Sequence, residues 1–170
     1  IENEYMTVDV DDHGAELQSI RTDDIEFLWQ GDPDVWGRRA PILFPIIGRL
    51  AGDVLRLKGV EYPMNQHGFA RDSQFTLLEQ YENMLRYRLV SNSQSLRIFP
   101  YSFMLDIVYV LSGNVLQVDL QVNNCGRDLM PFAIGGHPAF ACDWFEDDDL
   151  TNYYLQFAEP ETASRMFLED

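Results

Sequence analysis

Apolar and polar residues alternate with a strict period of two from Leu116 to Asn123. Successive side chains of a strand point to opposite faces of a sheet, so this alternation predicts a strand that is buried on one face only. The preceding segment, Phe103 to Leu111, is apolar on both faces apart from Asp106, and the Ser-Gly-Asn sequence at 112–114 has the composition of a tight turn. We therefore expect the two strands to pair as an antiparallel hairpin.

Shorter runs of the same kind, separated by polar residues or glycine, precede this hairpin. Further strands are expected at Tyr5–Val10, Ala15–Ile20, Ile25–Trp29, Gln74–Gln80 and Met84–Val90. No window keeps apolar residues at positions i, i+3, i+4 and i+7, which is the pattern of an amphipathic helix. The chain is therefore predicted to be all-β and mainly antiparallel, with two sheets packed as a β-sandwich.

The stretch from Gly31 to Arg71 breaks this rhythm because it is rich in proline and glycine. Loops of this length in a compact domain are usually either functional or disordered. The stretch also contains many apolar residues, among them Trp36, Phe44 and Phe69, and is too apolar for a solvated linker. We therefore expect an ordered loop region with a functional role.

The size of the chain fits one domain. With 170 residues, of which 46% are hydrophobic, residues 1–170 are predicted to form a single β-sandwich domain with a substantial core. No run approaches the roughly 18 to 20 apolar residues of a membrane span, and no signal-peptide pattern opens the chain, so no membrane partner is expected. Cys125 and Cys142 allow one disulfide but not a secreted disulfide scaffold, which favours the cytoplasm.

The charge of the chain is strongly negative, with a formal net charge of −16. Nucleic-acid binding depends on clustered lysine and arginine that neutralise phosphates, so a nucleic-acid partner is excluded. Of the 12 basic residues, all except Lys58 are arginine. Arginine favours forked hydrogen bonds to paired hydroxyls, carboxylates or phosphate, although a general surface preference for arginine is the alternative explanation.

Two of the three histidines have unusual neighbours, in Gln66-His67-Gly68 and in Gly135-Gly136-His137-Pro138. Glycine allows backbone or ligand to approach a histidine closely, and histidine titrates near neutrality. Two such residues in one cleft would suit proton transfer to and from oxygen atoms. The alternative is a pair of structural histidines at strand ends. The third, His13, is expected in a surface turn.

Other kinds of site find less support in the sequence. His-x-His, His-Glu-x-x-His and Cys-x-x-Cys are all missing, so no metal site is predicted from local spacing. The acidic run at 146–149 is typical of a solvated loop, with calcium binding as the alternative. A serine hydrolase is disfavoured because the chain contains no Gly-x-Ser-x-Gly.

Several strings together resemble the aldose 1-epimerase (galactose mutarotase-like) family, and its LacX-like branch in particular. They cover nearly the whole chain in the family's order: Gly14 to Ile20, Glu26 to Asp32 with Trp36, Pro41 to Pro45, Gly48-Arg49, Gln66 to Arg71, Pro100 to Phe103, and Met130 to Phe140. The resemblance implies a galactose mutarotase-like supersandwich of roughly 270 to 300 residues, beyond the usual size of one domain. This chain is then expected to be the N-terminal part of a longer epimerase-type domain.

The resemblance also implies an activity, the interconversion of the α and β anomers of a hexose or hexose phosphate. An acid and a base open the sugar ring and close it on the other face, and no cofactor is needed. By motif, His137 resembles the histidine that protonates the ring oxygen, and His67 the one that assists it and holds a hydroxyl. Arg49 resembles a sugar-binding arginine. Arg71 is expected to hold a hydroxyl or phosphate, or to pair with a carboxylate such as Asp72 or Glu16.

The family's catalytic base is a glutamate close to its C-terminus, a region that lies beyond Asp170. The complete protein is therefore expected to be an isomerase, while this chain alone is expected to lack one catalytic group. The alternative is a carbohydrate-binding or sensing protein, which would keep Trp36, Arg49 and the histidines for stacking and hydrogen bonding. A purely structural β-sandwich would leave the glycine-flanked histidines unexplained. If the later strands are missing, the apolar face at 116–122 is uncovered, and self-association is expected.

Overall fold

The computed structural model describes residues 1–23, 25–142, 144, 149–160 and 162. Almost every regular element in these ranges is a β-strand, and the strands of each sheet run antiparallel. The strands are β1 (Thr7–Val10), β2 (Leu17–Thr22), β3 (Ile25–Glu26), β4 (Ile42–Leu43), β5 (Val54–Leu57), β6 (Val60–Pro63), β7 (Thr76–Tyr81), β8 (Met84–Val90), β9 (Phe103–Ser112), β10 (Val115–Asn124) and β11 (Gly135–Gly136). The helical turns are η1 (Ala51–Asp53), η2 (Ala70–Asp72), α1 (Ser95–Ile98) and η3 (Leu150–Asn152). The all-β prediction is confirmed.

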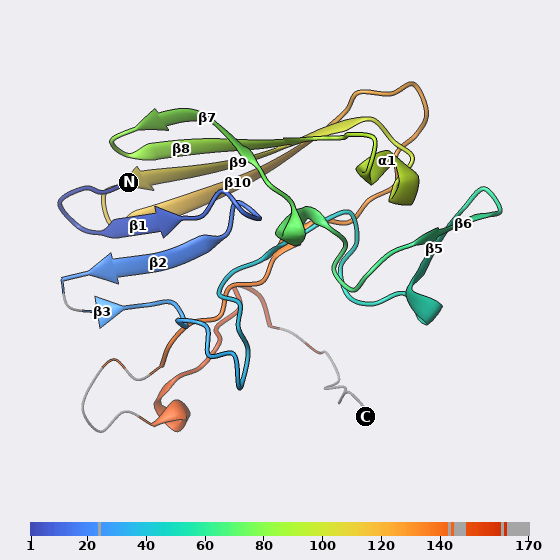
Figure 1. Cartoon of the computed structure of the whole chain (residues 1–170). Coiled ribbons are helices and arrows are strands. Elements are labelled where there is room, and N and C mark those ends of the chain that lie inside the picture. Colours follow the sequence, from blue (N-terminus) through green and yellow to red (C-terminus); the bar gives the residue numbers. More distant parts are fainter. Residues whose placement is uncertain (24, 143, 145–148, 161, 163–170) are drawn as a thin grey trace.

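Two sheets form the body of the molecule. The larger has the strand order β10-β9-β8-β7, and the smaller, β1-β2-β3, packs against it (Figure 1). The predicted hairpin is β9–β10, which pairs in register from Phe103 opposite Asn124 to Ser112 opposite Val115. Gly113 takes a left-handed φ of 57° in its turn, as the turn composition predicted.

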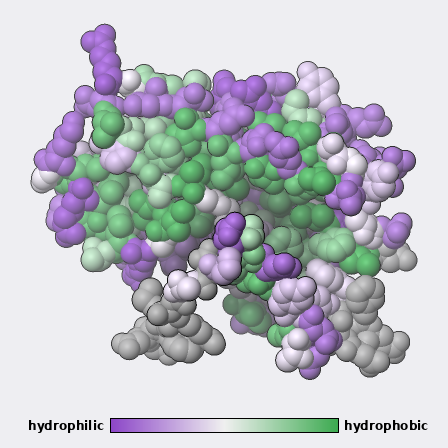
Figure 2. Space-filling view, turned by 180° about the vertical axis from the view of Figure 1, so that it is seen from behind, coloured by the Kyte–Doolittle hydropathy of each residue, from purple (hydrophilic) through white to green (hydrophobic). Residues whose placement is uncertain are grey.

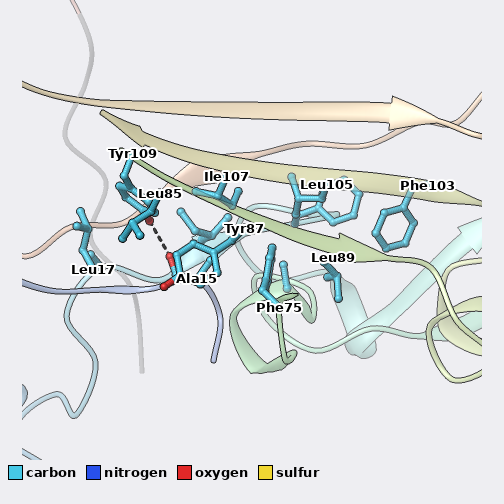
Figure 3. Packing of buried hydrophobic residues seen from close by; sticks show 14 of the residues in the cluster. Ala15, Leu17, Phe75, Leu85, Tyr87, Leu89, Phe103, Leu105, Ile107 and Tyr109 are labelled. Atoms are coloured by element: carbon cyan, nitrogen blue, oxygen red, sulfur yellow. Dashed lines mark hydrogen bonds between the residues drawn. The ribbon is translucent and has the colours of Figure 1, made fainter. Parts of the chain in front are cut away.

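The core lies between these sheets. Alternate residues of β9 are fully buried, and they meet buried residues of β8 and the segment that leads into β2 (Figure 3). The phenol of Tyr109 donates a hydrogen bond of 2.6 Å to the carbonyl oxygen of Ala15. Burial raises the pKa of Tyr109, so the phenol stays protonated and keeps this donor. The hydrogen bond satisfies a polar group that would otherwise destabilise the apolar core.

Asp106, the single charged residue of β9, faces the opposite side of the sheet and is fully buried. It accepts hydrogen bonds of 2.6 Å from Arg88 Nε and 2.6 Å from Arg86 Nη2, which lie on the neighbouring strand β8. The hydrogen bond from Arg88 holds the pKa of Asp106 below its usual range, and Arg86 adds to this effect, although burial opposes it. The exception in the apolar pattern is therefore a paired, structural carboxylate.

The apolar face of β10 is only partly covered. Leu116, Leu120 and Val122 pack against the core but stay half-buried, and Val118 is 38% exposed. A groove of about 550 Å³ adjoins this face, and its apolar lining consists of Met6, Leu17, Ile20, Phe27, Leu116, Val118, Pro138 and Phe140. Figure 2 shows hydrophobic residues across the middle of the molecule, bordered by hydrophilic ones. Self-association through the β10 face stays a prediction, which sedimentation of the chain would test.

The stretch at 31–71 is ordered, but it is not the plain loop region that the sequence predicted. It contains β4 and the β5–β6 hairpin, which projects from the sheets (Figure 1). Lys58 and Gly59 form the turn of this hairpin, with left-handed φ values of 49° and 81°. Strands of four residues are too short to show a clear alternation, and the surrounding proline and glycine hid the pattern.

Three smaller features concern His13, the two cysteines and the length of the helices. His13 is exposed, as expected, but it forms an isolated antiparallel β-bridge with Gln74 just before the turn at Gly14 and Ala15, and its amide donates to Asp11 Oδ1 at 2.9 Å. Cys125 and Cys142 are both free, so the possible disulfide is not formed. Within the described ranges, no helix has the length and apolar character that crossing a membrane requires.

Candidate functional site

His67 is attached to Gly48 by two reciprocal hydrogen bonds. The backbone N–H of His67 donates to the Gly48 carbonyl oxygen at 2.8 Å, and the backbone N–H of Gly48 donates to His67 Nδ1 at 3.0 Å. His67 has a left-handed φ of 67°, which is uncommon for a residue with a side chain. Both the backbone and the half-buried imidazole of His67 are therefore held in place.

The residue after this histidine, Gly68, occupies a position that requires glycine. Its φ is 76°, and a Cβ atom at this position would lie 2.2 Å from the carbonyl oxygen of Phe44. That same oxygen accepts hydrogen bonds from the N–H groups of Phe69 and Ala70, at 3.0 and 3.2 Å. The glycine thus lets the His67 segment lie directly on the chain that follows β4.

His137 reaches the same place from a distant part of the sequence. Gly135 and Gly136 form β11, which pairs with β4, and the N–H of His137 donates to the Pro41 carbonyl oxygen at 3.1 Å. Because both histidine segments are attached to β4 or its flanking residues, their imidazoles meet. The ring centroids of His67 and His137 are 5.8 Å apart, with an angle of 68° between the rings.

Trp36 completes what we call the His–Trp cluster, consisting of Trp36, His67 and His137. Its ring centroid lies 5.2 Å from that of His137. The Trp36 carbonyl oxygen accepts a hydrogen bond of 2.7 Å from the indole of Trp29, which anchors the loop. The cluster combines two imidazoles, which can donate or accept protons, with an indole face of the kind that packs on apolar surfaces.

Arg71 lies close enough to influence this cluster. Burial lowers the pKa of His67, and the positive charges of Arg71 and His137 lower it further. The Arg71 side chain is 19% exposed, and its Nε, 3.6 Å from Asp72 Oδ2, makes no hydrogen bond within the described residues. The expected pairing with Asp72 is therefore present, but only as a loose ion pair.

Glu16, the other suggested partner of Arg71, is engaged elsewhere. Its Oε1 accepts hydrogen bonds from the backbone N–H groups of Arg39 and Ala40, at 2.8 and 2.9 Å. Its Oε2 lies 3.7 Å from Nη1 of Arg38. The other terminal nitrogen of Arg38, Nη2, pairs with Asp72. Arg38 thus makes the ion pair with Glu16 that the sequence offered to Arg71.

Arg49 follows Gly48 in the chain, but its guanidinium is exposed and already engaged. Arg49 Nε and Nη2 donate to the two carboxylate oxygens of Asp53, at 2.8 and 2.7 Å. The hydrogen bond and charge of Asp53 raise the pKa of Arg49. A sugar that bound Arg49 would have to share it with Asp53. The structure brings His67, His137 and Trp36 together, places the charge of Arg71 near enough to lower the pKa of His67, and gives Arg49 a carboxylate partner.

Sequence reasoning missed two groups next to His67. One is the Gly48 amide, which a side-chain pattern cannot reveal because it belongs to the backbone. The other is Gln66, whose Nε2 lies 3.3 Å from His67 Nε2. The described residues contain no group of three or more potential metal ligands, and positions 146–148 of the acidic run lie outside them.

Comparison with known proteins places the chain in a family. Residues 1–162 match the aldose 1-epimerase family. The chain is 39% identical over 171 aligned residues to the plasmid-encoded protein LacX of Lactococcus lactis subsp. lactis, and this alignment covers 96% of the chain and 57% of that protein.

Two solved structures share its fold at similar identity. The galactose mutarotase related enzyme of Lactobacillus acidophilus is 40% identical, with a TM-score of 0.81 over 82% of this chain and 47% of that one. A galactose mutarotase-like protein from Lactobacillus casei ATCC 334 is 41% identical, with a TM-score of 0.80 over 82% and 48%.

The chain therefore belongs to the aldose 1-epimerase family, and the resemblance to its LacX-like branch is confirmed. It spans 57% of the length of LacX and about half of each of the two solved chains. The galactose mutarotase-like fold is shared over that part.

Proposed function

We propose that the complete protein is an aldose 1-epimerase that interconverts the α and β anomers of a hexose or hexose phosphate. One observation carries this proposal beyond family membership. Two histidines that are 70 positions apart in the sequence present their rings 5.8 Å apart, beside an indole. A hexose with its hydroxyl groups is comparable in size to this separation, so one sugar can contact both imidazoles.

The proposed reaction is a ring opening followed by closure on the other face. A base takes the proton of the anomeric hydroxyl while the bond between the anomeric carbon and the ring oxygen breaks. The ring oxygen keeps the electron pair of that bond and receives a proton from an acid. The resulting aldehyde rotates, and the reverse steps give the other anomer. The carbon keeps its oxidation state, so no redox cofactor takes part.

We assign the acid to His137. Its side chain is exposed, so it is open to a ligand, while His67 is fixed by Gly48 and has a lowered pKa. Trp36 would support the apolar face of the sugar, as aromatic rings do. Arg71, whose side chain is 19% exposed, would donate from its terminal guanidinium nitrogens to a hydroxyl or phosphate.

The base is proposed to come from the part of the family fold that this chain does not span. The chain covers 57% of LacX, and the family resemblance places a catalytic glutamate near the C-terminus. We therefore propose turnover for the complete fold, of which residues 1–170 contribute the acid and part of the sugar site. Binding without turnover is the alternative outcome of the experiment.

The experiment is polarimetry with freshly dissolved α-D-glucose, α-D-galactose and a hexose 6-phosphate. The complete protein should accelerate the change in optical rotation of at least one of them, and His137→Asn should not. His13→Asn, a change at an exposed residue outside the His–Trp cluster, is the matched control and should behave as the wild type. Calorimetric sugar binding without acceleration would replace the enzyme with a binding protein.

A further inference from the structure

The environment of His67 decides where its proton is. The N–H of Gly48 lies 3.0 Å from His67 Nδ1, and a backbone amide nitrogen can only donate. Nδ1 must therefore offer a lone pair. A neutral imidazole carries a single ring proton, which places that proton on Nε2.

The second ring nitrogen supports the same assignment. Gln66 Nε2 lies 3.3 Å from His67 Nε2, so a nitrogen donor faces each ring nitrogen. An imidazole with one proton cannot accept at both nitrogens. The Gly48 amide is fixed by the backbone, whereas a glutamine amide can turn by 180° and exchange its oxygen for its nitrogen. Gln66 therefore presents its oxygen to an N–H on Nε2.

The ring cannot easily leave this arrangement. Rotation of the imidazole would break the bond to Gly48, while the N–H of His67 still holds the segment to the Gly48 carbonyl oxygen at 2.8 Å. Protonation of Nδ1 would place two N–H groups against each other. The charged groups that act on the ring, Arg71 and His137, also oppose a positive charge on it, as does burial.

From this geometry we propose that Gly48 locks His67 as the neutral Nε2–H tautomer, so that His67 is a permanent hydrogen-bond donor to a sugar hydroxyl and not a proton-transfer group. The assignment rests on the proposed function for its sugar partner, but the tautomer itself does not. In the free protein the Nε2–H bonds Gln66. A bound sugar takes the place of Gln66, and His67 then positions the sugar for His137.

The tautomer can be measured directly. Histidine-selective nitrogen NMR of the purified protein separates pyridine-type from pyrrole-type ring nitrogens, and the signals that disappear in His67→Gln are those of His67. Nδ1 of His67 should be pyridine-type and Nε2 pyrrole-type from pH 8 down to the mildly acidic range. A protonated Nδ1, or titration of His67 like an exposed histidine, would overturn the proposal. Since this readout needs no sugar, it stands even if no sugar is turned over.

Two substitutions test the role of the donor. His67→Gln places an amide N–H near the position of Nε2, whereas His67→Asn reaches only the position of Nδ1. His67→Gln should keep kcat/KM, or sugar affinity if there is no turnover, within roughly tenfold of the wild type, and His67→Asn should lose more. Asparagine tolerates the left-handed backbone better than glutamine does. Backbone strain alone would therefore favour the Asn variant, the opposite of the result expected from the donor role. Equal losses in both variants, or a better Asn variant, would refute the donor role.

Discussion

The His67 and His137 segments look alike in the sequence, yet the structure holds them differently. Each has glycine beside its histidine, and each is attached to β4 or its flanking residues. Gly68 is required by a left-handed φ and by contact with Phe44, whereas the Gly136 backbone is free of both constraints. Within the described residues, hydrogen bonds hold His67 through both its ring and its backbone, whereas they hold His137 through its backbone alone. This difference matches the roles proposed above, in which His67 positions the sugar and His137 transfers the proton.

The largest effect is expected at Gly68. Gly68→Ala should lower the free energy of unfolding by about 2 to 5 kcal/mol, because the new Cβ would collide with the Phe44 carbonyl oxygen at a left-handed φ. In the matched control, Gly136→Ala, the Cβ would meet Pro138 Cδ at 3.9 Å, an ordinary contact. Urea unfolding measures the free energy of unfolding of both variants. Equal losses of stability in Gly68→Ala and Gly136→Ala would contradict the difference between the two segments.

The next effect concerns turnover. In the complete protein, His137→Asn should lower kcat for the best sugar by about 10²-fold or more, because a positioned general acid contributes roughly 10²- to 10⁴-fold. KM should change little if His137 acts mainly as the bond breaks. Polarimetry at saturating sugar measures kcat. A near-normal kcat would show that His137 is not the acid, and it would favour the binding-protein alternative.

A smaller effect is expected at Arg49, which lies beside the fixed segment. Arg49→Ala should raise KM by about three- to tenfold with little change in kcat, because an arginine on spectator hydroxyls binds the ground and transition states alike. Asp53→Asn is the informative partner, since it would free the guanidinium from its ion pair. If Asp53→Asn lowers KM in the wild type but not in Arg49→Ala, Arg49 contacts the sugar. An unchanged KM in Arg49→Ala would show that it does not.

The smallest effect is a pH dependence of stability. The pKa of His67 is lower in the folded protein than in the unfolded one, where it is about 6.5. Below about pH 6.5 the folded protein therefore binds fewer protons than the unfolded protein. The stability that neutral His67 contributes is present above about pH 6.5 and is lost as the pH falls towards the folded pKa. The stability difference between the wild type and His67→Gln should therefore narrow from pH 7 to pH 5. Parallel stability curves would contradict this, and His13→Asn should leave the slope unchanged.

The sequence predicted most of the fold and only part of the site. The β9–β10 hairpin followed from alternation at 116–123, because the period of two is a local property of a strand. The β5–β6 hairpin was missed because its strands are short and lie among proline and glycine. Spacing alone left structural histidines as an open alternative, and it was the family resemblance that placed His67 and His137 in one site. Neither the Asp53 partner of Arg49 nor the Gly48 amide leaves a readable pattern.

β4 has a consequence for the order in which the molecule folds. β9 pairs with β10, the next strand along the chain, whereas β4 pairs with β11, which lies more than 90 positions further along the chain. Contacts between distant segments carry a larger loop-closure entropy and form late. We expect the two-residue pairing of β4 with β11 to exchange its amide hydrogens through openings that leave the β8–β9 core intact. The His–Trp cluster would then assemble last in folding and open first, well before the sandwich unfolds.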